Sequence, residues 1–260
     1  LEEHDGVLLL FSPRLKSLSW LRHVFTTRKG AQSPAPLDSF NLGRHWHTAQ
    51  SKEDALANRA RLCTIFGIDH QQLVVPSQKH TNNVIGLEGN SFSEEANSAG
   101  IDGLVTQRPG QGLLLHFADC VPVMLADQET RTISVVHAGW RGTAAGIVRN
   151  AVQALIARGS DPRNIIVAIG PSIASCCFET SAEVASELAK SVGGGEDLIS
   201  WKGERAYPDL KAINAEQARQ AGVEQIDMTS WCTACHPELF YSHRQSGGST
   251  GRQGALACIC

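Results

Sequence analysis

The sequence has no long apolar segment and no excess of basic residues. Its longest uninterrupted apolar runs, such as residues 7–11 and 165–169, have five or six residues, whereas a helix needs about 20 to span a bilayer. Its 23 Lys and Arg residues are outnumbered by 26 Asp and Glu residues, so no overall basic field favours non-specific binding of nucleic acids. We therefore expect a soluble protein that binds neither membranes nor nucleic acids.

The chain also lacks the features of exported and repetitive proteins. Residues 1–5 are acidic where a secretory signal is basic, and the apolar stretch behind them is too short for a signal core. No repeat of about 20 to 50 residues is visible, which excludes solenoids and propellers. The eight cysteines are spread from Cys63 to Cys260 and do not form a compact secreted framework. We expect a cytoplasmic protein whose thiols are reduced.

What the chain does have is enough apolar material for a large core. It has 260 residues, of which 42% are hydrophobic, and this suffices to bury a substantial interior. The proline-containing stretch 28–40 and the glycine-rich stretch 245–254 are interpreted as long loops inside one domain, not as linkers between domains. We predict a single catalytic domain over residues 1–260.

Four predicted helices are recognised by their start signals. In each case a polar residue that can accept a hydrogen bond from the first helical turn precedes apolar residues at helical spacing, and a glycine follows three of them. The helices are expected to run from Ser51-x-x-Asp54 to Gly67, from Thr143 to Gly159, from Thr180-x-x-Glu183 to Val192 and from Asp209 to Gly222.

Short apolar runs between these helices predict strands, and several are near-continuous in Val, Ile and Leu, as in strands covered on both faces. Strands interleaved with helices indicate a layered α/β or α+β domain. The consecutive strands of residues 112–137 argue against a purely doubly wound sheet. The predicted strands cover residues 73–75, 83–87, 112–117, 121–126, 132–137, 165–169, 225–228 and 254–259.

Two candidate functional residues stand at strand ends in the same stretch. Cys120 lies where one apolar run ends at an acidic residue and another begins at Pro122, which places it at a break in a strand. His137 is the last residue of the strand predicted over residues 132–137. Taken alone, a buried cysteine is usually a small apolar filler. Facing each other, Cys120 and His137 could form a nucleophile pair or two thirds of a metal site.

The turn after His137 is a candidate anion site. Gly139-Trp140-Arg141-Gly142 leads into the helix predicted from Thr143. Backbone N–H groups and Arg141 would then lie at a helix N-terminus, which suits an anion such as phosphate.

A third candidate, His80, lies in a polar turn at the end of an apolar strand. It belongs to a series of six motifs: Gln78-x-His80-x-x-x-Val84, Asp102-Gly-Leu-Val-Thr106, Ala118-Asp-Cys-Val-Pro122, His137-Ala-Gly-Trp-Arg-Gly142, Ile169-Gly-Pro171 and Phe240-Tyr-Ser-His-Arg244. In their order these motifs resemble the family once called laccase-like multicopper polyphenol oxidases. Its members are now described as purine nucleoside phosphorylases with adenosine deaminase activity. The resemblance extends from His23 to Arg252.

This resemblance implies a zinc (Zn²⁺) site formed by His80, Cys120 and His137. It also implies two packed mixed β-sheets covered by helices, in a fold resembling the cytotoxic necrotising factor deamidases. The implied substrates are phosphate and a purine nucleoside such as adenosine, inosine or methylthioadenosine. Two imidazoles and one thiolate leave a fourth tetrahedral position for water, as in a catalytic zinc site, and a hydroxide formed there could attack adenine.

Phosphorolysis also needs a site for phosphate. Arg28, Arg44, Arg141 and Arg244 are candidate anion contacts, and the resemblance favours Arg28 and Arg244. Deamination needs an acid that moves a proton, and Asp119 is the nearest in sequence to Cys120. On an extended strand, however, adjacent side chains point to opposite faces.

The chain departs from the family pattern in two places. After Asn41-Leu-Gly43 the family usually has a residue, then His-Val-Gly-Asp, whereas here His45 is followed by Trp46-His47-Thr48. His45 remains a candidate for the pocket wall, but the neighbouring acidic position is lost. Ser172 replaces a cysteine found in many members, which argues against an essential thiol there.

The last cysteines of the chain resemble other metal motifs. Cys232-Thr-Ala-Cys235-His236 has the spacing of a haem attachment site, but such attachment is expected in exported proteins. A four-thiolate zinc site of Cys232, Cys235, Cys258 and Cys260 is conceivable, although the second pair has one intervening residue and lies on an apolar strand. We interpret these residues as core or surface thiols.

Alternatives to the zinc enzyme remain open. Two histidines and a cysteine are also the ligand set of a blue-copper (Cu) centre, which would make the chain a copper-dependent phenol oxidase. A multicopper oxidase needs several His-x-His pairs, however, and the sequence contains only His45-Trp46-His47. A metal-free hydrolase or deamidase would use Cys120 as nucleophile and His137 as base. A non-catalytic metal-binding protein is the fourth possibility.

Overall fold

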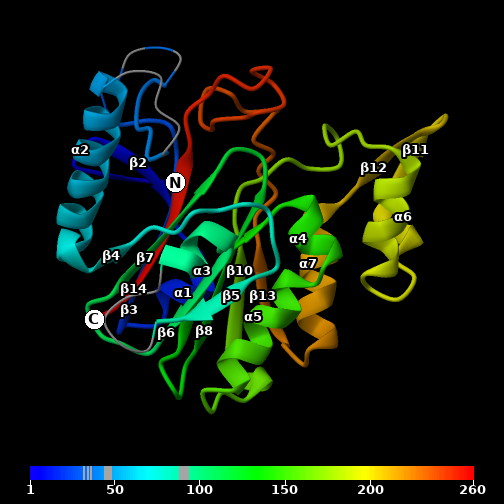
Figure 1. Ribbon diagram of the computed structural model, residues 1–260, viewed down its shortest axis with the longest axis horizontal. Coiled ribbons are helices and arrows are strands. Elements are labelled where there is room, and N and C mark those ends of the chain that lie inside the picture. The colour runs from blue at the N-terminus through cyan, green and yellow to red at the C-terminus, as the bar shows by residue number, and fades with distance from the viewer. Residues whose placement is uncertain (32, 34, 36, 44–48, 88–93) are drawn as a thin grey trace.

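The computed structural model describes the chain except residues 32, 34, 36, 44–48 and 88–93, and its main feature is a pair of mixed β-sheets that pack face to face (Figure 1). The first sheet has six strands among the described residues, antiparallel except for its last pair. In spatial order they are β1 (Glu2–His4), β2 (Val7–Leu10), β3 (Leu21–Thr26), β14 (Gln253–Ile259), β7 (Gly112–Phe117) and β4 (Leu73–Val74).

The second sheet also has six strands in the described part of the chain, and its outermost pair at either edge is parallel. A separate two-stranded ribbon, β11 (Ile199–Lys202) and β12 (Arg205–Pro208), projects beside it. The strands of the second sheet are, in spatial order, β13 (Gln225–Met228), β10 (Ile165–Ile169), β8 (Val121–Asp127), β9 (Ile133–Ala138), β6 (Gly103–Thr106) and β5 (Val84–Gly86).

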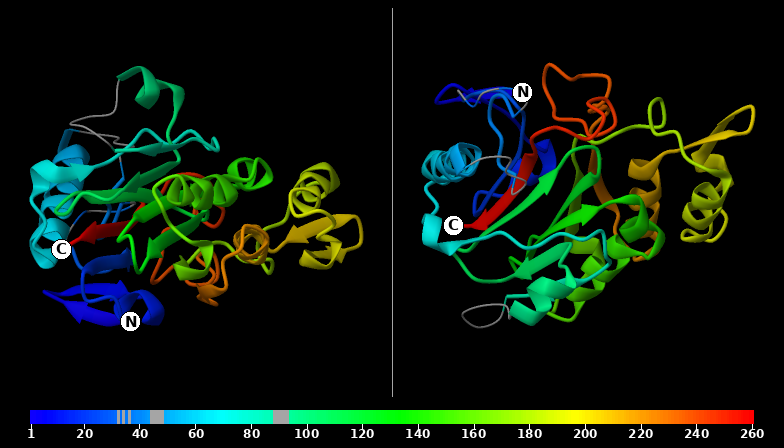
Figure 2. Two further views of the ribbon diagram at one scale, coloured as in Figure 1. Left: turned by 90° about the horizontal axis from the view of Figure 1, so that it is seen from below. Right: turned by 45° about the horizontal axis from the view of Figure 1, so that its top comes forward.

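Helices cover the two outer faces of this pair of sheets, with α2 on one side and α4, α5 and α7 on the other, while α6 lies farther out, against α4 and β12 (Figures 1 and 2). None of the helices in the described ranges has the length and apolar character needed to cross a membrane. Short 3-10 turns occur at 70–72, 162–164 and 196–198. The helices are α1 (Pro13–Lys16), α2 (Ala49–Phe66), α3 (Glu94–Ala99), α4 (Trp140–Ala144), α5 (Ile147–Ile156), α6 (Ala182–Lys190) and α7 (Leu210–Gln220).

The alternation of side chains along the central strands produces these layers. In β7, Leu113 and Leu115 belong to the core between the sheets, whereas Leu114 packs in the core beneath α2. In β8, Met124 faces the layer between the sheets and Val123 faces α5 and α7. Because successive strand residues point to opposite faces, a strand that is covered on both sides must be apolar throughout. The predicted layered α/β fold is therefore confirmed.

Some helix boundaries differ from the predicted ones, either because a glycine interrupts the helix or because a neighbouring residue provides the cap. The helix predicted from Thr143 is interrupted by Gly146, whose φ of 78° separates α4 from α5. Ser51 lies inside α2 instead of capping it, and Ser181, not Thr180, caps α6 by accepting a hydrogen bond from the Val184 N–H. The cap at Asp209 is confirmed, with its carboxylate accepting from the Ala212 N–H at 3.0 Å.

All eight predicted strands are present, with ends that differ by at most a few residues. The prediction missed β1 to β3, β6 and the β11–β12 ribbon. Two of these missed strands matter for the architecture, since β3 pairs with β14 in the middle of the first sheet and β6 pairs with β9 in the second.

His23, on β3, makes stability depend on pH. Its side chain is 3% exposed and its Nε2 accepts a hydrogen bond from the Ser12 N–H at 3.1 Å. Burial lowers the pKa of His23 to about 4 from its ordinary value of 6.5, so between these values only the unfolded chain takes up the proton. Stability conferred by the neutral imidazole is present above pH 6.5 and is lost progressively as the pH falls towards 4.

We expect His23 to contribute about 2–3 kcal/mol to the loss of unfolding free energy between pH 7.5 and 4.5. Denaturant titrations of the wild-type protein and of His23→Gln, whose amide oxygen can still accept the Ser12 N–H, will measure this. The wild-type value must fall more steeply than that of the variant. Parallel pH profiles would mean that His23 is protonated in the folded protein.

Candidate active site

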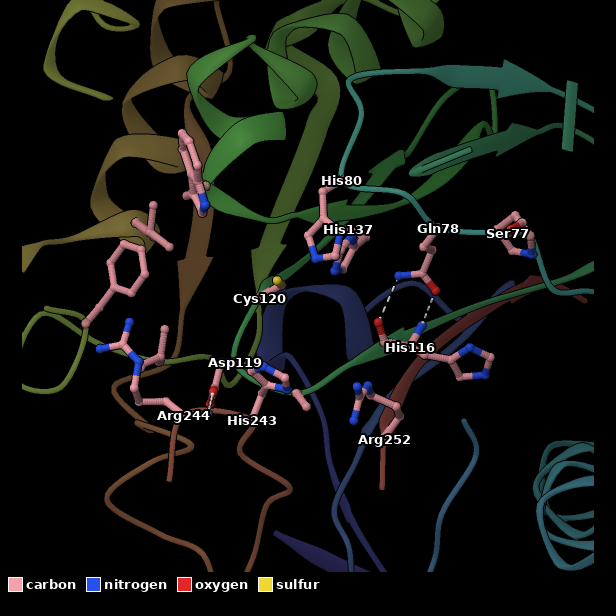
Figure 3. Close-up of a pocket in the computed structure, with 16 residues that line it drawn as sticks. Ser77, Gln78, His80, His116, Asp119, Cys120, His137, His243, Arg244 and Arg252 are labelled. Atoms are coloured by element: carbon pink, nitrogen blue, oxygen red, sulfur yellow. Dashed lines mark hydrogen bonds between the residues drawn. The ribbon is translucent and has the colours of Figure 1, made fainter. Parts of the chain in front are cut away.

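Cys120 lies where the chain passes from one sheet to the other. Strand β7 ends at Phe117 in the first sheet, and β8 begins at Val121 in the second. The short connection includes Asp119, a non-glycine residue at φ 87°, a backbone conformation that surrounding contacts must hold in place. As predicted, Cys120 occupies a break between strands, at the edge where the two sheets meet (Figure 3).

The β8–β9 pairing brings His137 next to Cys120. Because these strands are antiparallel, Pro122 faces His137 in the register, so the residues at the start of β8 lie beside the end of β9. His137 is 4% exposed. Its Nδ1 shares a hydrogen bond of 2.8 Å with the Asp102 carboxylate, which leaves Nε2 as the ring nitrogen available to another partner.

The same carboxylate also positions His80. Asp102 is fully buried and accepts the backbone N–H groups of Lys79, His80 and Thr81 at 3.1, 3.0 and 2.7 Å, together with the Thr81 hydroxyl at 2.8 Å. These bonds hold the loop between β4 and β5, in which His80 takes a left-handed φ of 60°. One buried carboxylate therefore fixes both histidines.

The structure brings together the three residues predicted as ligands. One nitrogen each of His80 and His137 and the Cys120 sulfur lie within 4.8 Å of one another, and the two imidazole rings are 4.9 Å apart between centroids. Gly139 permits this approach, because a Cβ there would lie 2.8 Å from His80 Cδ2 and 3.2 Å from the Cys120 sulfur. Any side chain at Gly139 would collide with His80 and Cys120, so the motif requires glycine at this position.

Electrostatics favour a thiolate at this position. Burial acts to raise the pKa of Cys120, but the charge of His137 and hydrogen bonds from His137 and His80 outweigh it and lower the pKa to about 6. Burial acts to lower the pKa of His137, yet the Cys120 thiolate and Asp102 raise it above its ordinary value. Without a metal, both shifts favour a Cys120 thiolate next to a protonated His137.

This donor set fits a zinc ion. Zinc binds thiolate and imidazole ligands, and three protein ligands with one further position are typical of catalytic zinc sites. The Asp102–His137 hydrogen bond is the kind of contact that orients a zinc-binding histidine. The same donors also suit copper, so the side chains alone do not identify the metal.

These three residues line a cavity of about 470 Å³, a size suited to a small organic ligand. Gln78 and the His116 backbone form part of its wall, joined by two hydrogen bonds of 2.8 Å (Figure 3). The lining comprises Pro76, Ser77, Gln78, His80, His116, Ala118, Asp119, Cys120, His137, Trp140, Ile173, Phe178, Leu210, His243, Arg244 and Arg252.

Of the predicted phosphate contacts that the structure describes, only Arg244 lines this cavity. Arg28 instead pairs with Asp38 at 3.1 Å and donates to the Pro237 carbonyl. Arg141 is exposed and its guanidinium lies 4.4 Å from the Trp140 ring centroid. These positions give no support to a phosphate-binding role for Arg28 or Arg141, while Arg44 and His45 lie outside the described residues.

Arg252, which was not among the predicted site residues, has a side chain that points into the cavity (Figure 3). Its Nη1 donates to the carbonyls of Thr250 and Gly251 at 2.8 and 2.9 Å, and these two bonds hold the guanidinium group in place. The one signal for Arg252 in the sequence is that the family resemblance extends as far as this residue.

Asp119 has a structural role in this wall. Its side-chain oxygens accept the Thr233 hydroxyl at 2.6 Å and the Arg244 N–H at 2.7 Å, and its carbonyl accepts the Ile173 N–H at 2.9 Å. Both carboxylate oxygens of Asp119 are therefore occupied, and its side chain and carbonyl together connect the segments that contain Ile173, Thr233 and Arg244. This arrangement suits an anchor better than a group that transfers protons.

Comparison with known proteins places these features in a family. Residues 22–260 match the family described as multi-copper polyphenol oxidoreductase laccase. The chain is 35% identical over 243 residues to the Geobacillus stearothermophilus protein named purine nucleoside phosphorylase YlmD, covering 89% of this chain and 87% of that protein. It is 34% identical over 238 residues to the Bacillus subtilis protein of the same name, covering 88% and 84%.

The fold is shared with solved structures as well. The crystal structure of YlmD from Geobacillus stearothermophilus superimposes with a TM-score of 0.87 at 31% identity, covering 100% of this chain and 98% of that one. The Bacillus licheniformis protein YfiH gives the same TM-score at 30% identity, covering 98% and 97%.

Proposed function

This chain belongs to the multi-copper polyphenol oxidoreductase laccase family, and on that premise we propose that it is a zinc-dependent purine nucleoside phosphorylase. The proposed substrates are phosphate with adenosine, inosine or methylthioadenosine, and the proposed second reaction is the deamination of adenosine. Residues 1–260 act as one catalytic domain. The observation that carries the proposal is the convergence of His80, Cys120 and His137 in a cavity that two arginines also line.

Phosphorolysis joins a phosphate oxygen to the anomeric carbon of the sugar and breaks the bond to the purine, which leaves with a proton. Arg244 and Arg252 supply positive charge for the phosphate in this cavity. Arg252 is better placed to do so, since among the described residues it donates to protein carbonyls through Nη1 alone, whereas Arg244 donates through both Nη1 and Nη2, to the carbonyls of Cys177 and Glu179. Trp140 and Phe178 supply the aromatic surface against which a purine would pack.

Adenosine deamination replaces the amino group of the base by oxygen from water and releases ammonia. A zinc ion bound by His80, Cys120 and His137 would supply Lewis-acid chemistry for this step. The chain itself holds the ligands in place through Asp102. The Gln78–His116 contact fixes part of the cavity wall against which a substrate would be oriented.

Two other functions have an observation in their favour. The family description and the two-histidine, one-cysteine donor set suit a copper oxidase of phenols. The thiolate–imidazolium pair of Cys120 and His137 suits a metal-free cysteine hydrolase. Neither accounts for two arginines in the same cavity as directly as a phosphate substrate does.

Incubating the purified protein with a panel of purine nucleosides will test the proposal. We expect free base to appear by chromatography only when phosphate is present, and adenosine also to give inosine. Phenol oxidation without added copper should be negligible. Zinc-loaded protein that releases no base from any nucleoside, or protein that carries several coppers and oxidises phenols, would overturn the proposal.

A further inference from the structure

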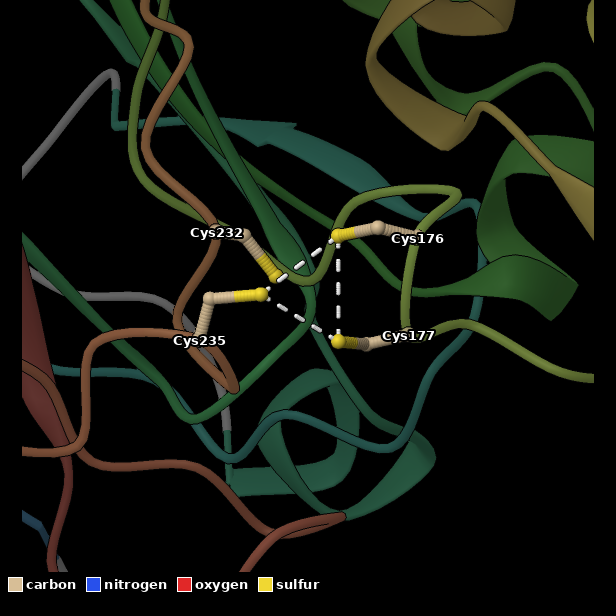
Figure 4. A group of neighbouring side chains, drawn as sticks. All are labelled: Cys176, Cys177, Cys232 and Cys235. Carbon is tan, nitrogen blue, oxygen red and sulfur yellow. Dashed lines mark hydrogen bonds between the residues drawn. The ribbon is translucent and has the colours of Figure 1, made fainter.

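A second group of cysteines lies apart from the three residues of the candidate active site. Cys176 and Cys177 are in the loop after β10, and Cys232 and Cys235 are in the loop after β13. Strands β10 and β13 are parallel neighbours, so the loops that follow them leave the same edge of the sheet. The sulfurs of all four residues meet between these loops (Figure 4).

Cys232 and Cys235 do not lie with Cys258 and Cys260, the other two cysteines of the four-thiolate site weighed from the sequence. Cys258 is buried in the core beneath α2 and Cys260 is exposed. The actual partners, Cys176 and Cys177, are more than 50 positions away in the sequence, and only the parallel strand pair brings them close.

The spacing of the sulfurs fits a tetrahedral thiolate site. The sulfur of Cys176 lies 3.7 Å from that of Cys177 and 3.6 Å from that of Cys235, and the Cys177–Cys235 distance is 3.4 Å. All four sulfurs lie within 4.8 Å of one another. A regular tetrahedron with zinc–sulfur bonds of about 2.3 Å has sulfur–sulfur edges of about 3.8 Å, whereas a disulfide needs about 2.05 Å.

The surroundings of the cluster suit a negatively charged metal–thiolate group. The Ala174 N–H donates to the Cys232 sulfur at 3.4 Å, the kind of contact that stabilises a ligating thiolate. The ammonium group of Lys211, a residue that is 4% exposed, is held beside the second loop by the carbonyls of Thr229 and Trp231. Four thiolates and one divalent cation would carry two negative charges, which Lys211 partly balances.

We propose that Cys176, Cys177, Cys232 and Cys235 bind a structural Zn²⁺ ion. Four protein ligands leave no open position, which is typical of structural and not catalytic zinc. Soft thiolates in a tetrahedral arrangement select zinc or iron among the common metals. The ion joins two loops that also meet at the Ser172–Cys232 bridge, through the Thr233 N–H to Ser172 carbonyl bond of 3.0 Å, and at the Ala174 N–H to Cys232 sulfur contact.

This ion would stabilise the wall of the candidate active site. Phe178, which lines the cavity, directly follows Cys177, and the Cys177 carbonyl accepts a hydrogen bond from the Arg244 guanidinium. Thr233 directly follows Cys232 and donates its hydroxyl to Asp119. Both halves of the cluster are therefore one residue away from groups that shape the cavity.

The test compares metal content in the full-length wild-type protein and in matched cysteine variants, by elemental analysis after gel filtration. We expect Cys235→Ser to lose one zinc per chain relative to wild type, whereas Cys260→Ser, at an exposed cysteine outside the cluster, keeps the wild-type content. Cys120→Ser should keep the ion bound by the four cysteines, whatever happens at the other site. Equal zinc in wild type and Cys235→Ser would overturn the proposal.

A crystal of the wild-type protein gives an answer that does not depend on the folding of any variant. An anomalous difference peak measured at the zinc absorption edge should lie between the four sulfurs. Iron at that position, no peak there, or a disulfide between any two of the four cysteines would overturn the assignment.

Discussion

Replacing His80 with alanine will greatly weaken zinc binding at the site shared with Cys120 and His137, and nucleoside phosphorolysis will be lost with it, because the proposed phosphorylase depends on zinc. A three-ligand site that loses one imidazole should bind zinc at least about 100-fold more weakly, since even the loss of a supporting group weakens binding by about 10–100-fold. Zinc titration against a competing chelator and phosphate-dependent release of base will measure the two losses. His70→Ala, at an exposed histidine outside the cavity, should change neither.

The same variant separates the zinc enzyme from the cysteine hydrolase. A mechanism that uses Cys120 as nucleophile and His137 as base has no need for His80 as a ligand. In the zinc enzyme, Cys120→Ser and His137→Ala should behave like His80→Ala, and added zinc should protect the Cys120 thiol from alkylation. A His80→Ala protein without zinc at this site that retains full turnover would show the hydrolase interpretation to be correct.

Asp102→Asn should weaken both the fold and the metal site. The Asp102 carboxylate accepts hydrogen bonds from three backbone N–H groups, the Thr81 hydroxyl and His137. An amide places an NH₂ group against some of these donors in either orientation, and breaking such a buried charged network typically reduces stability by about 3–5 kcal/mol. Zinc affinity should fall by about 10–100-fold, because both histidines lose their support.

Asp127→Asn is the matched control for this variant. Asp127 is likewise fully buried, and its Oδ1 accepts the N–H groups of Glu129 and Thr130 at 2.7 and 3.2 Å, at the far end of the β8–β9 hairpin. Denaturant unfolding and zinc titration of both variants will separate general destabilisation from loss of the site. Zinc affinity that is unchanged in Asp102→Asn, or reduced equally in both, would contradict the role assigned to Asp102.

The sequence predicted the layers and the proximity of Cys120 and His137 because both depend on local patterns. Near-continuous apolar runs such as 165–169 mark strands covered on both faces, and the hairpin that carries Cys120 and His137 is contiguous in sequence. Placing His80 beside them required the family motifs, because its loop is held by Asp102 across 22 residues. The number of residues between Asp102 and His80 does not by itself indicate that the two are in contact.

The missed features depend on contacts that are distant in sequence or on backbone details. The helix predicted from Thr143 is divided into α4 and α5 because one glycine, Gly146, takes a left-handed conformation. Arg252 was missed because an arginine in a glycine-rich loop is usually a solvated surface residue. The pairing of Cys176 and Cys177 with Cys232 and Cys235 follows from the parallel alignment of β10 and β13, which no local pattern indicates.

The position of β14 has a consequence for how the protein acquires its fold. This strand ends at Ile259 yet lies between β3 and β7 in the interior of the first sheet, where it pairs with β3 from Leu21 onwards. During translation, β3 and β7 therefore emerge from the ribosome long before the strand that joins them, and each exposes an unpaired apolar edge in the interval. Such non-local pairing slows folding and leaves a nascent chain open to aggregation. The second sheet, whose strands are all made by Met228, can assemble first and serve as the surface on which the first sheet is completed.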